Sequence, residues 1–187
     1  MAIDWSVPSL AELRRRDRLP AGTPRRPRFQ NREFYFRPGL TYSVVSSGRI
    51  SVRLLPEGCV FGHKGSAIFV EGGAVTERFL LGYLNSRLAT YFMKRIVNTT
   101  ATADVGYIEK LPFRRPDDDA EREVGERVDR IVAMLRADPD AGIQPLRDEI
   151  DERILDLFEI RGQARQVVWE FYDRVGRAEA DDEQLVA

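Results

Sequence analysis

The sequence predicts an α+β protein: a small, mainly antiparallel sheet region packed with a long helix and followed by a helical C-terminal unit. Two patterns predict this fold. Short runs rich in β-branched and aromatic residues, separated by Gly, Pro and Ser, occupy residues 33–70. Apolar residues spaced three or four apart follow, over 75–95 and again from 117 to 172. A chain of 187 residues, 43% of them hydrophobic, can bury a core.

The N-terminal segment, residues 1–30, predicts a short helix and a basic linker. Ser9 is the expected N-cap of a helix over 9–18, with Glu12 completing a capping box. Prolines and arginines then alternate as far as residue 28, which excludes regular structure over 19–30.

Residues 31–115 predict a basic α+β domain. Turn-forming Gly, Pro and Ser separate five expected strands, at Glu33–Phe36, Tyr42–Val45, Ile50–Leu54, Val60–Phe61 and Ala67–Val70. A helix of about five turns, running to about Arg95, is expected to pack against this sheet. Its apolar positions are Val75, Phe79, Leu80, Tyr83, Leu84, Leu88, Tyr91 and Phe92.

Residues 116–176 predict an acidic helical subdomain, a hairpin plus one helix. Three aspartates at 117–119 favour a helix N-terminus there, and the segment 138–142 breaks the apolar pattern. Further helices are expected around 146–158 and 167–172. Residues 177–187 are polar and acidic without periodicity, and a disordered tail is expected.

The net charge of −1 conceals a division of charge at Pro116. Residues 1–115 carry 19 Lys and Arg against 9 Asp and Glu, whereas residues 116–187 carry 10 against 21. A basic segment of this kind is typical of proteins that bind a polyanion, and the acidic segment suggests a different partner or simple solvation.

Several function classes are excluded or disfavoured by the sequence. Cys59 is the single cysteine and His63 the single histidine, so no disulfide forms within the chain and a metal centre is not expected. No apolar stretch approaches about 18 residues and no signal peptide is recognisable, so we expect a cytoplasmic protein without a membrane partner. Walker, nucleophile-elbow and zinc-protease motifs are also missing, and a free-standing enzyme is not expected.

Five blocks of residues follow one another between 31 and 112. They are Phe34-Tyr35-Phe36-Arg37-Pro38-Gly39-Leu40-Thr41-Tyr42-Ser43, Gly48-Arg49-Ile50-Ser51-Val52-Arg53, Gly58 to Phe69 with Gly65-Ser66-Ala67-Ile68-Phe69, Leu80-Leu81-Gly82-Tyr83-Leu84-Asn85-Ser86-Arg87, and Asn98-Thr99-Thr100 with Val105-Gly106-Tyr107-Ile108-Glu109-Lys110-Leu111-Pro112. In this order they resemble the target-recognition region of BREX-type (phage-growth-limitation, PglX-like) adenine-specific DNA methyltransferases, which is related to the TaqI-like C-terminal specificity domain of restriction-modification methylases. The acidic helices extend the resemblance to about residues 28–172.

This resemblance implies a non-catalytic DNA-binding module of a restriction-modification or antiviral defence system, whose partners are double-stranded DNA and a catalytic domain or other defence subunit. The catalytic Asn-Pro-Pro-Tyr motif is absent from the sequence. S-adenosylmethionine is therefore expected only in a catalytic domain or partner, and the chain is interpreted as a separate subunit or as a split or truncated gene product. The run after Asn98 departs from the family's Asn-Pro-Thr pattern.

Candidate DNA contacts lie on the linker, in or beside turns of the basic sheet, within the long helix and just after it, where side chains reach phosphates or base edges. For the linker arginines a solvated surface is the alternative, and for the polar run at 98–102 it is capping of the helix. For Asn85, Ser86 and Arg87 the first interpretation is a hydrogen bond that holds the helix on the sheet, and DNA contact is the alternative. The candidates are Arg25, Arg26, Arg28, Arg37, Arg49, Arg53, His63, Lys64, Arg87, Asn98, Thr99 and Thr100.

A second hypothesis assigns the chain to a different class, a docking or assembly subunit of a defence complex that does not itself read DNA. The acidic helical segment would carry that role. The recognised DNA sequence is not readable from the residues, because recognition depends on loop geometry and DNA shape as well as residue type.

Overall fold

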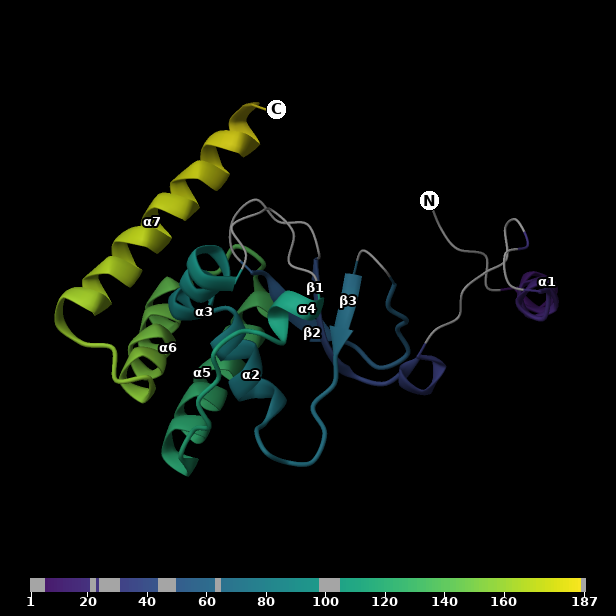
Figure 1. Ribbon diagram of the computed structural model, residues 1–187, viewed down its shortest axis with the longest axis horizontal. Helices are drawn as coiled ribbons and strands as arrows, with labels where there is room; N and C mark the ends of the chain where they lie inside the picture. The colour runs from purple at the N-terminus through teal and green to yellow at the C-terminus, as the bar shows by residue number, and fades with distance from the viewer. Residues whose placement is uncertain are drawn as a thin grey trace. The chain divides into compact units, whose positions relative to one another are not determined.

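The computed structural model describes residues 6–20, 23, 31–43, 50–62, 65–97 and 105–185 (Figure 1). The chain divides into two compact units, Met1–Tyr35 and Phe36–Ala187. The predicted α+β fold is confirmed, since a three-stranded antiparallel sheet is combined with a majority of helices. Within the described ranges, no helix combines the length and apolar character needed to cross a membrane.

The first unit contains the helix α1 (Val7–Asp17) and the 3₁₀ helix η1 (Arg32–Phe34). The predicted N-terminal helix is confirmed, but Ser9 is not its cap. The helix begins two residues earlier, after Ser6, and has a proline in its first turn, where the missing N–H costs no hydrogen bond. Glu12 pairs with Arg15 and Arg16 instead of closing a capping box.

The prediction of a strand over Glu33–Phe36 is wrong. The backbone is left-handed at Asn31 (φ 53°) and at Phe36 (φ 68°), and a strand cannot pass through either conformation. The Phe36 N–H instead donates to the Cys59 carbonyl at 2.9 Å, and the Gly58 N–H donates to the Phe36 carbonyl at 3.0 Å. Gly58 itself has a φ of 80°, which a glycine adopts without strain.

Three strands form the sheet: β1 (Gly39–Ser43), β2 (Val52–Leu55) and β3 (Gly65–Ile68), in the order β2-β1-β3. Both neighbours run antiparallel to β1, with Leu40 opposite Leu54 and Ile68. The strand expected at 60–61 is not present, and the backbone there makes a single isolated bridge between Gly62 and Gly65.

The long helix expected over 75–95 is interrupted. It is divided into α2 (Glu77–Leu84), α3 (Arg87–Phe92) and a π-helical turn, η2 (Met93–Val97). Ser86 has an extended backbone (φ −72°, ψ 158°), and its hydroxyl accepts a hydrogen bond from the Ala89 N–H at 3.1 Å. Ser86 is therefore a helix N-cap, a role for which serine is favoured over alanine by about 1 kcal/mol.

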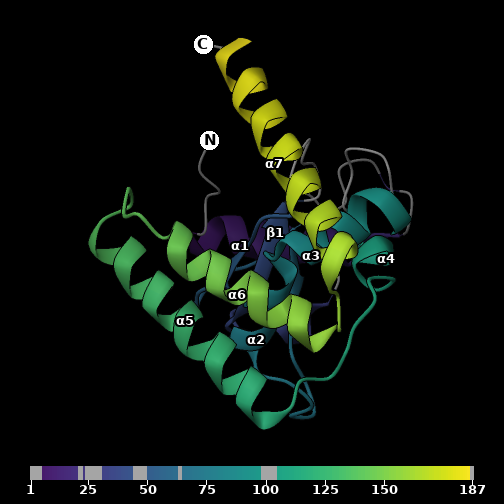
Figure 2. The same cartoon turned by 90° about the vertical axis from the view of Figure 1, so that its left-hand side faces the viewer.

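The C-terminal part is helical, as predicted. A short helix, α4 (Val105–Ile108), precedes α5 (Asp118–Ala137), α6 (Gln144–Leu157) and α7 (Gly162–Leu185). Asp117 caps α5 by accepting a hydrogen bond from the Ala120 N–H at 2.7 Å. Figure 2 shows α5 and α6 as a hairpin in front of α2, which packs closely on α5.

The tail predicted to be disordered from residue 177 is helical as far as Leu185, because α7 continues through it. Five of the seven residues at 178–184 are alanine, glutamate or glutamine, which are strong helix formers, and the other two are Asp181 and Asp182.

The boundary expected at 115/116 marks the change in charge but does not separate compact units. Buried residues of the sheet, of α2 and α3, and of α5, α6 and α7 belong to one hydrophobic core. Leu40, Phe79, Val124 and Ile154 are all fully buried in it. The acidic helices therefore complete the core of the basic sheet.

Candidate nucleic-acid interface

Of the predicted DNA contacts, Arg37, Arg53 and Arg87 lie within the described part of the chain. In that same part, no group of three or more His, Cys, Asp and Glu side chains is arranged to hold a metal ion. The other candidates lie outside the described residues: Arg25, Arg26, Arg28, Arg49, His63, Lys64, Asn98, Thr99 and Thr100.

Arg53 lies on β2 with its side chain exposed. It faces Thr41 across the strand pair, and its guanidinium donates a hydrogen bond to the Ser43 hydroxyl at 3.0 Å. Because side chains alternate along a strand and Leu40 and Tyr42 point into the core, Thr41, Ser43 and Arg53 share the opposite face. We call these three residues the polar sheet face.

The polar sheet face combines the Arg53 guanidinium with the Ser43 hydroxyl as possible donors to phosphate, since the Thr41 hydroxyl already donates to the Ser66 carbonyl at 2.9 Å. No described carboxylate forms an ion pair with Arg53, so its charge is not neutralised locally in that part of the structure. Guanidinium and hydroxyl groups are the donors that most often contact phosphate oxygens. The surface has the chemistry of a phosphate contact, and binding by it stays a prediction.

Arg37 lies two residues before β1 and is partly neutralised. Its guanidinium lies 3.7 Å from the Glu71 carboxylate and 5.4 Å from the centre of the Phe69 ring. The side chain is nevertheless about half exposed. Exposed ion pairs of this kind are weak, so the pair with Glu71 by itself does not prevent Arg37 from contacting a phosphate.

Arg87 is not a surface candidate, and we correct the prediction that it contacts DNA. Its side chain is 7% exposed and lies within 3.1 Å of carboxylate oxygens of Asp148, Asp151 and Asp173. The guanidinium also stacks over the rings of Trp169 and Tyr172, at 3.9 and 4.4 Å from their centres. Arg87 thus joins α3 to α6 and α7, and we call these contacts the Arg87 cluster.

Charge and burial compete within the Arg87 cluster. Burial lowers the pKa of Arg87, but hydrogen bonds to Asp173 and Asp148 and the nearby Asp151 outweigh it and leave the pKa above its ordinary value. Burial raises the pKa of Asp151 to about 7, although the Arg87 N–H and guanidinium oppose this change. Because three carboxylates share one guanidinium, the negative charge of an ionised Asp151 is only partly neutralised.

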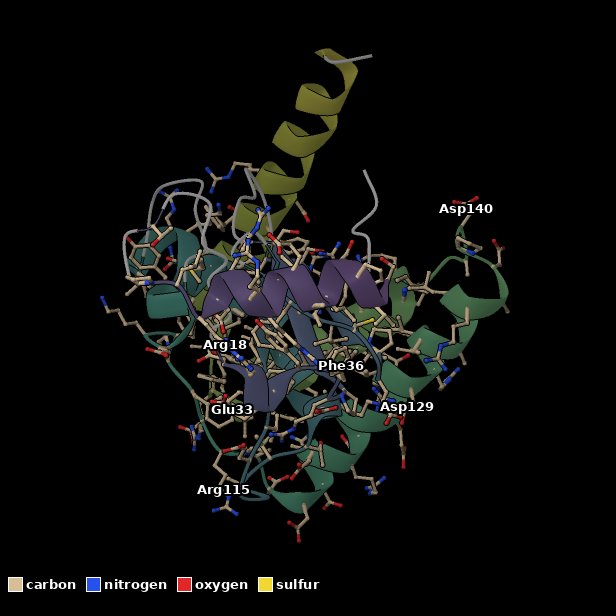
Figure 3. All side chains as sticks on the ribbon, turned by 90° about the vertical axis from the view of Figure 1, so that its right-hand side faces the viewer. Arg18, Glu33, Phe36, Arg115, Asp129 and Asp140 are labelled. Atoms are coloured by element: carbon tan, nitrogen blue, oxygen red, sulfur yellow. The ribbon has the colours of Figure 1, made fainter. Side chains whose placement is uncertain are left out.

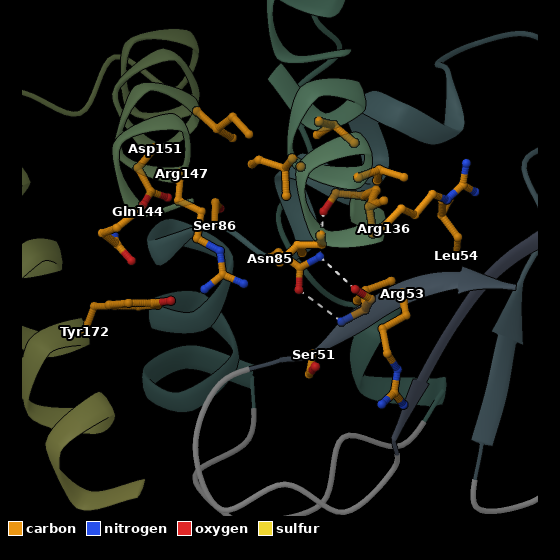
Figure 4. Close-up of a pocket in the computed structure, with 18 residues that line it drawn as sticks. Ser51, Arg53, Leu54, Asn85, Ser86, Arg136, Gln144, Arg147, Asp151 and Tyr172 are labelled. Atoms are coloured by element: carbon orange, nitrogen blue, oxygen red, sulfur yellow. Dashed lines mark hydrogen bonds between the residues drawn. The ribbon is translucent and has the colours of Figure 1, made fainter. Parts of the chain in front are cut away.

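Asn85 fixes the α2–α3 junction to the sheet (Figure 4). Its side-chain amide accepts from the Val52 N–H and donates to the Val52 carbonyl, both at 3.0 Å, and it also donates to the Leu81 carbonyl at 2.9 Å. The structural interpretation of Asn85 as a hydrogen-bond link between helix and sheet is therefore confirmed.

We expect Asn85→Ala to lower the free energy of unfolding by about 1–3 kcal/mol, because it leaves both backbone groups of Val52 without their partner in a half-buried position. Urea unfolding measures this loss. Asn85→Asp is the matched variant, since it keeps the acceptor for the Val52 N–H but loses both donors, and its loss should fall between wild type and Asn85→Ala. Wild-type stability in Asn85→Ala would contradict the assigned link.

The Asp151 carboxyl predicts a pH dependence of stability. In the unfolded chain an Asp has a pKa of about 3.9, so between about pH 4 and 7 the unfolded state releases a proton that the folded state retains. The contribution of Asp151 to the free energy of unfolding is fully present below pH 4, falls as pH rises toward 7, and is constant above pH 7. Urea unfolding of wild type and Asp151→Asn from pH 4 to 8 should show the difference in stability falling over this window, and a flat difference would exclude the expected titration.

The acidic helical part contains several ion pairs between its own side chains, which the sequence did not indicate. Arg127 pairs with Glu149, Arg153 with Asp117 and Glu123, and Arg165 with Glu152 and Asp156. Figure 3 shows Asp129 on α5 and Asp140 in the turn that follows, and Asp129 pairs with Arg78 of α2. Such half-exposed pairs orient the helices more than they stabilise them.

Asp148, Asp151 and Asp173 were missed as functional partners of Arg87. One signal was available for Asp151, which lies four residues before Leu155 and therefore on the apolar face of its helix. A carboxylate at such a position requires a buried partner.

Comparison with known proteins finds no matching family model. Part of the chain is similar to adenine-specific methyltransferases. Adenine-specific methyltransferase PglX of Lacticaseibacillus casei (strain Zhang) is 30% identical over 108 residues, 58% of this chain and 9% of that protein. Adenine-specific methyltransferase BrxX of Escherichia coli O9:H4 (strain HS) is 31% identical over 84 residues, 44% of this chain and 7% of that protein. The chain thus matches less than a tenth of the length of either methyltransferase.

Proposed function

We propose that this chain is a DNA-binding, target-recognition module of an adenine-specific DNA methyltransferase, and that methyl transfer belongs to a catalytic domain or partner that binds S-adenosylmethionine. The observation that carries the proposal is the partial similarity to PglX and BrxX, both adenine-specific methyltransferases. That similarity supports a methyltransferase-related role.

The charge distribution supports the choice of DNA as the ligand. Residues 1–115 have an excess of ten positive charges, and Arg53 on the polar sheet face has no described carboxylate partner. Each phosphate that a Lys or Arg neutralises releases counterions, so binding of this kind weakens steeply with salt. The proposed module therefore binds duplex DNA with strong salt dependence.

Fluorescence anisotropy with a labelled duplex, between about 50 and 200 mM salt, tests the proposal. We expect a linear fall of log affinity with log salt, and Arg53→Gln should reduce the slope by about 1 if Arg53 contacts one phosphate. Arg122→Gln is the matched control, since it removes the same charge from the outer face of α5, where Arg122 pairs with Asp119 and Glu126.

Binding that does not respond to salt, or no binding at the lowest salt, would overturn the proposal. A pull-down of a methyltransferase or defence subunit that survives nuclease treatment, combined with no duplex binding, would instead favour the assembly role.

A further inference from the structure

A cleft of about 350 Å³ lies between β2, α5 and α6 and is bounded by the α2–α3 junction (Figure 4). Its apolar wall is formed by Leu81, Val128, Ile131, Val132, Leu135 and Ile150. Ligand pockets in proteins have volumes of roughly 300–1,000 Å³ and are mostly apolar with a few polar groups. The cleft is therefore at the small end of this range.

Three arginines line the same cleft: Arg53, Arg136 and Arg147. Arg147 extends from α6 into the cleft toward Ser86, and Arg136 reaches from α5 toward Leu54 of β2 (Figure 4). Asp151 is the one carboxylate among the described lining residues, and it is already paired with Arg87.

Arg136 and Arg147 differ from the neighbouring arginines in their ion pairing within the described part of the chain. Residues 116–187 have more than twice as many acidic as basic residues, and Arg127 and Arg153 of the same two helices each pair with a carboxylate. Neither Arg136 nor Arg147 forms an ion pair with any described residue. Positive charge beside an aliphatic wall is complementary to an anion that has an apolar body.

We propose that this cleft binds a small amphipathic anion, with a ring or chain no larger than a mononucleotide on the aliphatic wall and a phosphate or carboxylate against Arg147 and Arg136. Arginine suits this role because its planar guanidinium donates two parallel hydrogen bonds to either head group. The cleft shares Arg53 with the polar sheet face, but the proposed anion contacts are Arg136 and Arg147, and the proposal holds whether or not the chain binds DNA.

The test uses the fluorescent anion 8-anilinonaphthalene-1-sulfonate and its uncharged analogue N-phenyl-1-naphthylamine on the full chain. The anion should bind more tightly than the neutral analogue. Arg147→Gln should weaken binding of the anion about tenfold, the effect of losing one charge-assisted hydrogen bond, and Arg136→Gln should also weaken it. Neither variant should change binding of the neutral analogue.

Arg130→Gln is the matched control, because Arg130 is an exposed residue of α5 that does not line the cleft. It should leave binding of the anion unchanged, and urea unfolding verifies that all variants are folded. Displacement of the probe by AMP but not adenosine would assign a phosphate head group, and displacement by octanoate would assign a carboxylate.

Equal binding of the charged and neutral probes, equal effects of Arg130→Gln and Arg147→Gln, or displacement by neither AMP nor octanoate would overturn the proposal. Probe binding by a wild-type chain that does not bind duplex DNA would show that the proposed function fails while this proposal stands, and duplex binding without probe binding would show the reverse.

Discussion

Arg87→Ala is expected to lower the free energy of unfolding by about 3–5 kcal/mol, the largest effect that we predict for a single substitution. The change removes the one guanidinium that compensates the buried Asp151 and that also contacts Asp148 and Asp173. It further removes the contacts with the Trp169 and Tyr172 rings, so α3 loses its side-chain links to α6 and α7, while the backbone N–H at position 87 can still donate to Asp151 of α6. Urea unfolding at neutral pH measures the loss.

Two further variants distinguish the loss of the Arg87 cluster from the loss of one positive charge at the surface. Arg87→Lys keeps the charge but cannot reach three carboxylates with a planar fork, so an intermediate loss is expected. Arg122→Ala removes an arginine that also has two acidic neighbours but lies on an exposed helix surface, and its unfolding midpoint should change little. Similar midpoints for Arg87→Ala and Arg122→Ala would contradict the assigned role of the cluster.

Gly82→Ala is expected to destabilise the protein by about 1–3 kcal/mol, although alanine normally favours a helix. A Cβ at Gly82 would lie 2.6 Å from a methyl group of Val124 and 3.2 Å from one of Val128. Both valines are buried where α2 packs on α5, so neither can move away freely. The substitution would force α2 and α5 apart, and chemical denaturation would detect this as a lower midpoint.

Gly125→Ala in the facing helix is the matched comparison. Its Cβ would meet the Arg78 side chain at 3.6 Å, an ordinary van der Waals distance. We expect this variant to be stabilised by about 0.5–1 kcal/mol, because alanine loses less backbone entropy than glycine in a helix. The two substitutions should therefore change the free energy of unfolding with opposite signs. Stabilisation by both would show that the α2–α5 contact is not tight.

Residues 82–87 join α2 and α3 to the sheet and to the acidic helices of the larger unit. Gly82 sets the distance between α2 and α5, Asn85 attaches the junction to β2, and Arg87 ties α3 to the acidic helices. The polar sheet face lies on the strands that this junction holds. Any recognition surface on the sheet consequently depends on helices from the acidic half of the chain.

The candidate site was only partly predictable from sequence. Arg37 and Arg53 were selected because basic residues near turns tend to be exposed, and both are exposed. Arg87 was selected for its charge, yet it is buried, because its partners lie 61, 64 and 86 residues away along the chain. The Arg136 and Arg147 pair was not selected, since only the packing of α5 beside α6 gives them a common cleft.

The sequence by itself determined the α+β class, the position of the sheet region, the division of charge at Pro116 and the start of α5 at its aspartate cap, because each depends on local propensity, periodicity or composition. The tertiary structure alone decided the break at Asn85 and Ser86, the burial of Arg87 and the union of basic and acidic segments in one core. These features depend on hydrogen bonds, ion pairs and apolar contacts between residues far apart in the chain, which no local pattern specifies.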